Sequence, residues 1–333
     1  MNIQHSELTQ AMNAWISDEK NRLSAVVIQD AYSLLQKKYA ELKQPSGEKE
    51  KPIILNDAMR VAYVLSRMPA TFAVASVVIQ ELCRHVPLEK RQSFLDLGTG
   101  TGAVLWALLN AGLDLKCITA LDQDQGMLEI AQALMRYHSR FPKQSVQWIQ
   151  KNLHQSLDLA HHDVVTLSYA LIEQHERTVI LDKMWALATQ ALIIIEPGTM
   201  KGFANILFAR DYFIQKGGLI VAPCSHSSVC PMKNNNWCHF DERIERTSWQ
   251  RSLKNASLGY EDEAYSYLIV TKFPVNNEGQ RILSPPLKRS GHVMLELCAP
   301  GEINKVTVTR KQKANYLLAK KKKWGDVISI CDI

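Results

Sequence analysis

Four cysteines in the second half of the chain have a residue type and spacing that indicate metal chemistry. Cys224, Cys230 and Cys238 lie within fifteen residues of one another, and Cys298 follows sixty residues after the third. Four thiolates suit a tetrahedral zinc ion or a 4Fe-4S cluster, because both accept a ligand set made only of cysteines. The spacing lacks the paired Cys-x2-Cys segments usual in structural zinc sites, which favours iron and sulfur.

Two histidines beside these cysteines keep zinc open as the alternative metal. His226 or His239 could replace one cysteine in a zinc site. The other three cysteines, Cys83, Cys117 and Cys331, are expected to be buried free thiols. Seven cysteines in a large chain that we expect to be intracellular indicate thiols or a metal site rather than disulfides.

A glycine-rich segment at residues 94–102 indicates a second site. Gly98, Gly100 and Gly102 alternate with threonines after a short apolar run. Because glycine lacks a Cβ, the backbone can turn here from a strand into a helix and approach a ligand closely. Gly98, Gly100 and Ala103 also satisfy the relaxed dinucleotide-binding pattern, and a structural turn without a ligand is a third interpretation.

Polar residues around these glycines indicate an adenosine ligand. Asp122 ends the next apolar run, twenty residues beyond Gly102, where its carboxylate could accept hydrogen bonds from both ribose hydroxyls. Asp96 precedes Gly98 by two residues, and this Asp-x-Gly-x-Gly-x-Gly form resembles the first motif of the class I S-adenosylmethionine-dependent methyltransferases. Asn152 could recognise adenine. The expected cofactor-binding residues are Asp96, Gly98, Thr99, Gly100, Gly102, Asp122 and Asn152.

An alternation of strand and helix patterns positions these residues. Strands are expected at residues 94–97, 117–121, 146–149, 163–167 and 191–195, with helices between most of them. This order predicts an α/β fold with a Rossmann-like, doubly wound parallel sheet, whose ligand lies at the carboxyl ends of the strands. The expected strand ends carry Asp96, Asp122, Asn152, Ser168 and Glu196.

The flanking segments have different patterns. Apolar spacing predicts one long helix over residues 15–42, a second helix capped by Asn56 and stopped by Pro69, and a third capped by Thr71. After residue 201, a helix, the cysteine-rich loop and strands near 265–272, 293–297 and 306–309 predict a small β module that carries the metal. We therefore expect an N-terminal helical segment at 1–90, a cofactor-binding core at 91–200 and a metal-binding part at 201–333.

Positive charge is concentrated at the C-terminal end. The formal net charge is +6, and the residues from 301 onward, with eight basic and three acidic side chains, supply +5 of it. Lys320, Lys321, Lys322 and Lys323 form an unbroken run beside Trp324. We expect these four lysines to contact RNA phosphates, although a solvated tail is the alternative interpretation.

Several segments in matching order resemble the methyltransferase-like proteins of the mitochondrial small ribosomal subunit and their bacterial relatives. They are Arg67-Met-Pro-Ala-Thr71, residues 96–102, Glu196-Pro-Gly-Thr199, Ala222-Pro-Cys224, Cys230-Pro-Met, Trp237-Cys-His-Phe240, Arg289-Ser-Gly-His-Val293, Glu296-Leu-Cys298 and Trp324-Gly-Asp326. The resemblance implies a class I methyltransferase fold, an iron-sulfur cluster bound by the four cysteines, and association with small-subunit ribosomal RNA during assembly.

The resemblance leaves two functions open. One is an S-adenosylmethionine-dependent ribosomal RNA methyltransferase, and the other is a non-catalytic assembly factor with a structural metal centre. Ser168-Tyr-Ala-Leu stands where an Asn/Asp-Pro-Pro-Tyr segment would position an exocyclic amine. A radical enzyme is disfavoured because the Cys-x3-Cys-x2-Cys spacing is absent. No targeting segment or apolar run of about 18 residues is evident, so we expect a cytoplasmic protein without membrane contact, monomeric away from the ribosome.

Overall fold

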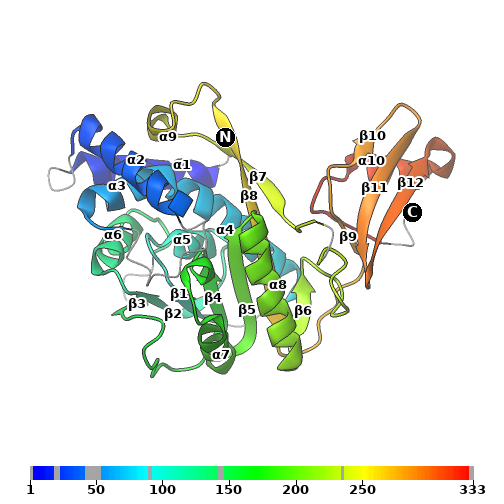
Figure 1. The fold of residues 1–333 in the computed structure, drawn as a ribbon, viewed down its shortest axis with the longest axis horizontal. Coiled ribbons are helices and arrows are strands. Elements are labelled where there is room, and N and C mark those ends of the chain that lie inside the picture. The colour runs from blue at the N-terminus through cyan, green and yellow to red at the C-terminus, as the bar shows by residue number, and fades with distance from the viewer. Residues whose placement is uncertain are drawn as a thin grey trace.

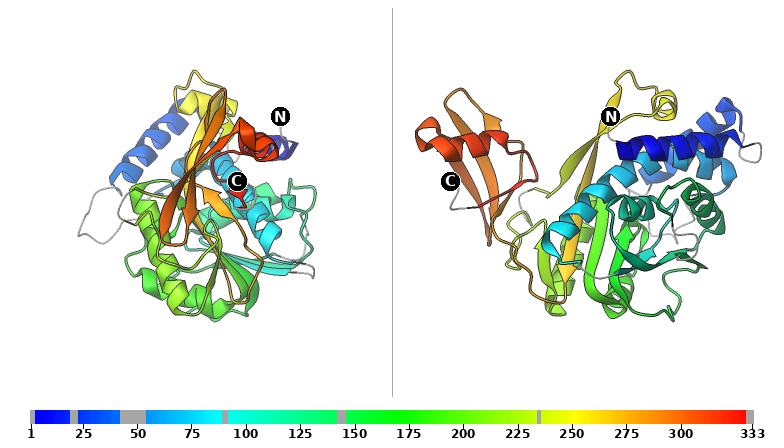
Figure 2. Two further views of the ribbon diagram at one scale, coloured as in Figure 1. Left: turned by 90° about the vertical axis from the view of Figure 1, so that its right-hand side faces the viewer. Right: turned by 180° about the vertical axis from the view of Figure 1, so that it is seen from behind.

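The computed structural model describes residues 3–18, 23–41, 54–88, 92–141, 146–233 and 236–329. These residues form two sheets (Figure 1). The larger is eight-stranded with the order β3-β2-β1-β4-β5-β8-β6, and β7 pairs with β8 beside this path. Helices cover both faces of this sheet, and the smaller sheet lies next to its β6 side (Figures 1 and 2).

The larger sheet is parallel from β3 to β5, and β8 runs antiparallel to both of its neighbours, β5 and β6. Its strands are β1 (Gln92–Leu97), β2 (Leu115–Asp122), β3 (Val146–Gln150), β4 (His162–Ser168), β5 (Ala188–Pro197), β6 (Leu219–Ala222), β7 (Phe240–Glu245) and β8 (Tyr260–Thr271). A mostly parallel sheet with one reversed strand in this position is the class I methyltransferase fold, which confirms the Rossmann-like α/β core expected from the sequence; the metal expected in the C-terminal module stays a prediction.

Two apolar cores lie on opposite faces of this sheet. Successive strand residues point to opposite faces, so Phe94 packs in one core and Leu95 in the other. The first core includes α5 (Ala103–Asn110) and part of α6 (Gln125–Met135), and the second includes α7 (Arg177–Leu187) and α8 (Met200–Gln215). The short turn η2 (Leu171–Glu173) follows β4. Both cores hold the carboxyl ends of the parallel strands in fixed register.

The N-terminal helices differ from the expectation in two places. The single long helix is two helices, α1 (Ile3–Ser17) and α2 (Ala25–Glu41). Asn56 caps α3 (Asp57–Ser66) as expected, accepting from Met59 N at 2.9 Å. Pro69 does not stop a helix but lies in the first turn of α4 (Met68–His85), where a missing N–H costs no hydrogen bond, so Thr71 is not the cap.

No single helix in the described ranges is long and apolar enough to cross a membrane. The bent pair α3 and α4, which meet at 50°, satisfies the requirement of length and composition together. Most residues of α4 are buried within the protein, from Met68 to Leu82.

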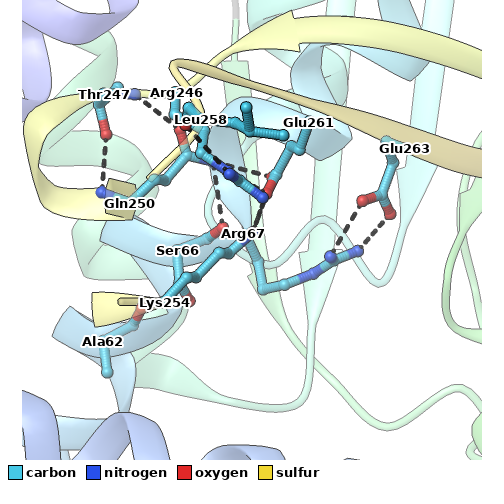
Figure 3. Close-up of polar contacts among 10 residues, drawn as sticks. All are labelled: Ala62, Ser66, Arg67, Arg246, Thr247, Gln250, Lys254, Leu258, Glu261 and Glu263. Atoms are coloured by element: carbon cyan, nitrogen blue, oxygen red, sulfur yellow. Dashed lines mark hydrogen bonds and ion pairs between the residues drawn. The ribbon is translucent and has the colours of Figure 1, made fainter. Parts of the chain in front are cut away.

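An arm formed by β7, α9 (Ser248–Leu253) and the first half of β8 extends from the sheet over the N-terminal helices (Figures 1 and 2). Figure 3 shows its contacts: Arg67 pairs with Glu263 at 2.7 Å, and Gln250 Nε2 donates to the Ser66 carbonyl at 3.3 Å. Lys254 pairs with Glu261, also in the arm. The strand expected at 265–272 is therefore part of the main sheet, not of the small β module.

The smaller sheet has five strands in the described part of the chain. They are β9 (Gln280–Ile282), β10 (Leu287–Lys288), β11 (His292–Ala299), β12 (Glu302–Thr309) and β13 (Val327–Ile328). The turn η3 (Arg310–Gln312) and helix α10 (Lys313–Lys321) follow β12, and α10 packs on the sheet through Tyr316 and Ala319. This module has its own apolar core, because its strands alternate buried Val293, Leu295 and Leu297 with less buried residues.

Candidate functional site: a glycine loop and a four-cysteine cavity

The glycine loop connects the end of β1 to α5. Gly98, Gly100 and Gly102 have φ angles of +67°, +52° and +78°, a region that favours glycine. A Cβ added to Gly98 would also lie 3.0 Å from Ala170 Cβ, beyond the end of β4. The loop is held to β2 by the Thr99 N–H, which donates to the Leu121 carbonyl at 2.9 Å. The backbone therefore forms a close turn at the carboxyl end of the sheet.

Asp122, at the end of β2, lies against this loop. Its Oδ2 accepts a hydrogen bond from Gly100 N at 2.8 Å, and its Oδ1 accepts one from Asp124 N at 2.9 Å. Burial raises the pKa of this carboxyl, and the two backbone donors oppose that shift. Each carboxylate oxygen can accept a second hydrogen bond, so acceptor positions remain for the hydroxyls of a ribose.

Asp96 and Thr99 carry buried polar atoms that make no hydrogen bond of good geometry within the described residues, although the Thr99 hydroxyl lies close enough to Asp96 to oppose the rise of its pKa. Asp96 is 1% exposed, and its Oδ1 accepts from Thr166 Oγ1 at 2.6 Å. Its Oδ2, and Thr99 Oγ1, have no hydrogen-bond partner among the described residues. Burial raises the pKa of Asp96 to about 6. Unpaired buried polar atoms beside a glycine loop fit a polar ligand that would satisfy them.

Asn152 follows β3 and forms a turn. Its side-chain oxygen accepts from His154 N at 2.8 Å, and its amide donates to Gln123 Oε1 at 2.7 Å. The residue therefore lies beside the end of β2, next to Asp122. Recognition of adenine by Asn152 stays a prediction.

The ends of β4 and β5 contain one feature that the sequence did not reveal. Tyr169 has a φ of +57°, unusual for a residue other than glycine, and its N–H donates to the Ile195 carbonyl at 2.7 Å. Its hydroxyl, like that of Ser168, is buried without a hydrogen-bond partner in the described ranges. Only the position directly after a predicted strand could have pointed to Tyr169.

Glu196 is fully buried at the end of β5. It accepts hydrogen bonds from Asn205 Nδ2 at 2.8 Å and from Ile172 N at 3.3 Å, so it ties η2 to α8. Burial raises its pKa to about 7. Glu196 thus connects η2 to α8 in the interior of the protein.

The four cysteines expected to bind metal all line one cavity of about 20 Å³. Cys224 follows β6, Cys230 lies in the loop beyond it, Cys238 precedes β7, and Cys298 lies in β11. His226 Nε2 is 3.5 Å from Cys298 Sγ. In the side-chain positions of the described residues, no three His, Cys, Asp or Glu side chains are grouped closely enough to hold a metal ion. The cavity thus collects the four expected donors around one space.

The thiols influence one another electrostatically. A hydrogen bond from Cys298 lowers the pKa of Cys224, and the positive charges of Arg210 and Arg281 act in the same direction. That hydrogen bond, together with burial, raises the pKa of Cys298. Burial also raises the pKa of Cys230. A buried group of thiols beside two cations fits a ligand set for a soft metal, which binds thiolates.

The other cysteines differ from the expectation. Cys83 is exposed on α4, and Cys117 in β2 is half-buried, so neither is a fully buried thiol. Cys83 lies near the end of α4, on its outward side, whereas the opposite side packs in the core. Cys331 lies outside the described residues.

A comparison with protein families matches residues 57–329 to the family described as mitochondrial small ribosomal subunit Rsm22. The match includes the glycine loop, the four cysteines and α10. The chain belongs to the Rsm22 family.

Individual relatives agree with this membership. The chain is 26% identical to the human mitochondrial ribosome assembly protein METTL17, over 82% of this chain and 63% of that protein. It is 30% identical to the Saccharomyces cerevisiae mitochondrial ribosome assembly protein RSM22, over 36% of this chain and 29% of that protein. The chain thus spans less than two thirds of each of these relatives. Among solved structures, it is similar to a Synechocystis magnesium protoporphyrin IX methyltransferase with bound SAM, with 12% identity and a TM-score of 0.40. The match covers 75% of this chain and 100% of that one.

The expected cytoplasmic location is contradicted by these comparisons. The Rsm22 family is described as mitochondrial, and both curated relatives are named as mitochondrial proteins. They point to mitochondria rather than to a bacterial cytoplasm. The resemblance seen in the sequence could not decide the compartment, because it included both mitochondrial proteins and their bacterial relatives.

An aromatic group connects the end of β5 to the cysteine loop and the C-terminal module in this Rsm22-family chain. Trp237 Nε1 donates to the Gly198 carbonyl, just beyond β5, at 3.0 Å, and its ring stacks on His239 at 5.2 Å. His239 in turn meets Trp324 edge to face at 4.9 Å. The end of β5, the cysteine loop and the C-terminal module are therefore in contact.

The four lysines expected to bind RNA are not equivalent. Lys320 and Lys321 end α10 and are exposed, and Lys323 is exposed beyond it. Lys322 is half-buried, and its Nζ donates to the Val327 carbonyl at 2.6 Å. Three of the four side chains are therefore free to face a phosphate backbone, whereas the fourth fastens β13 to α10.

Proposed function

We propose that this chain binds S-adenosylmethionine and acts in assembly of the small ribosomal subunit, with a metal centre in the four-cysteine cavity. The observation that carries the proposal is membership of the Rsm22 family across residues 57–329, which contain both candidate sites. The relatives named above are ribosome assembly proteins.

The glycine loop supports a role in cofactor binding. Gly98, Gly100 and Gly102 allow close approach of the ligand, and the Asp122 carboxylate would accept hydrogen bonds from the ribose. Asp96 and Thr99 would supply their unpaired atoms to the rest of the cofactor. When bound, S-adenosylmethionine supplies an electrophilic methyl group. The role of the chain is to bind and orient it.

The cysteine cavity supports a structural metal centre. Cys224, Cys230, Cys238 and Cys298 would hold a 4Fe-4S cluster, with zinc as the alternative. Because the cysteine loop and β11 each contribute ligands, the centre would join the C-terminal module to the methyltransferase-like core. The exposed lysines at the end of α10 would then be held at a fixed position relative to the core, as a phosphate-binding surface for ribosomal RNA.

A second function, methyl transfer to ribosomal RNA, is favoured by one observation. Ser168 and Tyr169 carry buried hydroxyls at the end of β4 that have no hydrogen-bond partner among the described residues, and the next residue, Ala170, lies against Gly98 of the loop that would hold the cofactor. Such groups could orient an acceptor. Assembly without transfer remains the first proposal, because Ser168-Tyr-Ala-Leu lacks the segment that positions an exocyclic amine.

Co-sedimentation tests the proposal. The full chain, purified without oxygen, is expected to sediment with small ribosomal subunits or their assembly intermediates. A Cys298→Ser variant should lose this association, whereas a Cys83→Ser variant should keep it, because Cys83 lies on α4 away from the cavity. Labelled S-adenosylmethionine in the same fractions reports methyl transfer. Failure of the wild-type chain to bind any small-subunit particle would refute the assembly role.

A further inference from the structure

We propose that Arg210 is a counter-charge for the metal centre and that its guanidinium donates a hydrogen bond to a sulfur of an anionic metal-thiolate group. The inference rests on the proposed metal centre and assigns a role to a residue outside the cysteine set. Arg210 lies on α8 and lines the same cavity as the four cysteines.

The position of Arg210 is fixed by the cysteine loop. Its Nη2 donates to the carbonyls of His226 at 2.9 Å and Ser228 at 2.7 Å, between Cys224 and Cys230. The side chain is 3% exposed. Its Nε has no hydrogen-bond partner among the residues that the structure describes. One donor of a buried cation is thus unused among the described residues, and the Arg210 guanidinium lies against Cys224 in the lining of the cavity.

The charge of Arg210 is poorly balanced by the protein itself. Its ion-pair contact is Asp211 Oδ1 at 3.6 Å, and the side chain of Asp211 is 45% exposed. A buried charge without a close partner is destabilising. Four thiolates carry more negative charge than one Zn²⁺ ion or one 4Fe-4S core neutralises. A metal bound by the four thiolates in the cavity would therefore supply the negative charge that Arg210 lacks.

Arg281 offers a matched comparison. It is also buried near the cavity, but its Nη2 pairs with Glu81 Oε1 at 2.6 Å, and its other donors reach the carbonyls of Pro223 and Gly325, each at 2.8 Å. Its charge is balanced, and each of its three nitrogens donates a hydrogen bond. Arg281 fastens α4, the cysteine loop and the C-terminal module together, and needs no ligand.

The alternative role for Arg210 is fastening alone. Its two hydrogen bonds to loop carbonyls would stabilise the loop whether or not a metal is bound. The two roles differ in one respect. A counter-charge stabilises the metal-loaded protein more than the metal-free protein. A contact that only fastens the loop stabilises both forms equally.

The test compares Arg210→Met and Arg281→Met with the wild-type full chain, purified without oxygen and assayed for iron, sulfide and zinc. Arg210→Met should release its metal to a chelator roughly tenfold faster, a change of about 1.4 kcal/mol in free energy if it reflects binding. The difference in unfolding temperature between metal-loaded and metal-free protein should also narrow. Arg281→Met should lower both unfolding temperatures together and leave their difference near the wild-type value.

If the centre contains iron, its one-electron midpoint potential gives a separate readout. Reduction adds one negative charge to the centre, and a nearby cation stabilises that charge. Arg210→Met should therefore lower the potential, and a tenfold change in the reduction equilibrium corresponds to about 59 mV for one electron. Arg210→Lys keeps the charge but removes the planar Nε donor, so its potential and release rate should be intermediate. This variant decides the question if Arg210→Met does not fold.

Two results would overturn the inference, and they are distinguishable. Wild-type protein without iron or zinc would remove the proposed metal centre and this role with it. Metal-loaded wild type with unchanged release rate and unchanged temperature difference in the Arg210 variants would leave the centre in place. Arg210 would then only fasten the loop.

Discussion

The glycine loop and the four-cysteine cavity are assembled in different ways. The loop is local: β1, the turn and α5 are consecutive, and the contact with Asp122 comes from the next strand. The cavity is built from α8, the loop after β6, the segment before β7, and β11 of the second sheet. A local site depends on backbone geometry, whereas a site built from distant segments depends on whatever holds those segments together. The two sites should therefore fail independently and with different consequences.

The largest effect is expected from breaking the cavity. Cys298→Ser should abolish metal binding, free the C-terminal module from the cysteine loop and lower solubility, because the energy of metal binding is coupled to local folding. Metal analysis measures the loss of metal, and cleavage after residue 222 in limited proteolysis measures the release of the C-terminal module. Affinity for S-adenosylmethionine should change little. Full metal content in this variant would remove Cys298 from the ligand set.

The next largest effect is expected from breaking the loop. Gly100→Val places a β-branched residue at a φ of +52°, which costs about 1 to 3 kcal/mol and moves the backbone that must meet the ligand. Calorimetric titration should show a collapse in affinity for S-adenosylmethionine with normal metal content. Gly217→Val is the control, since Gly217 has a φ of +86° and open space around it, far from the loop in sequence. Equal loss of affinity in both variants would attribute the effect to general destabilisation.

The sequence anticipated these two sites to different degrees. The apolar runs and helical patterns around residues 94–197 located the parallel strands within a few residues, because strands buried on both faces form continuous apolar runs. The four cysteines could be grouped from residue type and spacing, and the structure places them around one cavity, while their binding of a metal stays a prediction. The partners of that set were not: Arg210 and Arg281 look like surface cations in the sequence, and only tertiary packing buries them.

The expectations that the structure corrected, and the strain that the sequence did not reveal, have separate causes. The strand at 265–272 was expected in the small β module because it follows the cysteine loop, but sequence order does not determine which sheet a long-range strand joins. Pro69 was expected to stop a helix, although proline also suits a first turn. The strain at Tyr169 could not be anticipated, because its φ of +57° depends on contacts at the strand ends rather than on residue type.

A smaller effect concerns pH. Burial raises the pKa of Glu196 from 4.5 to about 7, so the unfolded chain ionises this group at lower pH than the folded chain does. The contribution of Glu196 to the free energy of unfolding therefore falls as pH rises from about 4.5 to 7, and this contribution does not change further above pH 7. Glu196→Gln should flatten this decline, by on the order of 2 to 3 kcal/mol between pH 5 and 8 in denaturant titrations. An identical pH profile in the variant would show that Glu196 ionises normally.

The smallest effect is expected at the basic end of α10. Replacing Lys320, Lys321 and Lys323 with alanine should weaken binding to small-subunit RNA similarly across sequences. It should also flatten the log-log salt dependence by about 0.7 to 0.9 for each RNA phosphate that these lysines neutralise in the wild-type protein. Lys322 is left in place because its ammonium group holds Val327. Replacing exposed Lys37, Lys116 and Lys201 instead is the control, and an equal change there would assign the effect to net charge.

The central claim is that four cysteines from distant segments bind one metal centre that joins the C-terminal module to the methyltransferase-like core. The most direct test is the visible absorption spectrum of the wild-type full chain purified without oxygen, with iron, acid-labile sulfide and zinc measured on the same sample. The account predicts a broad visible absorbance that bleaches on reduction, with about four iron and four sulfide per chain for a 4Fe-4S cluster. A colourless protein with one zinc per chain would keep the centre and change its metal, and a chain with neither metal would contradict the account.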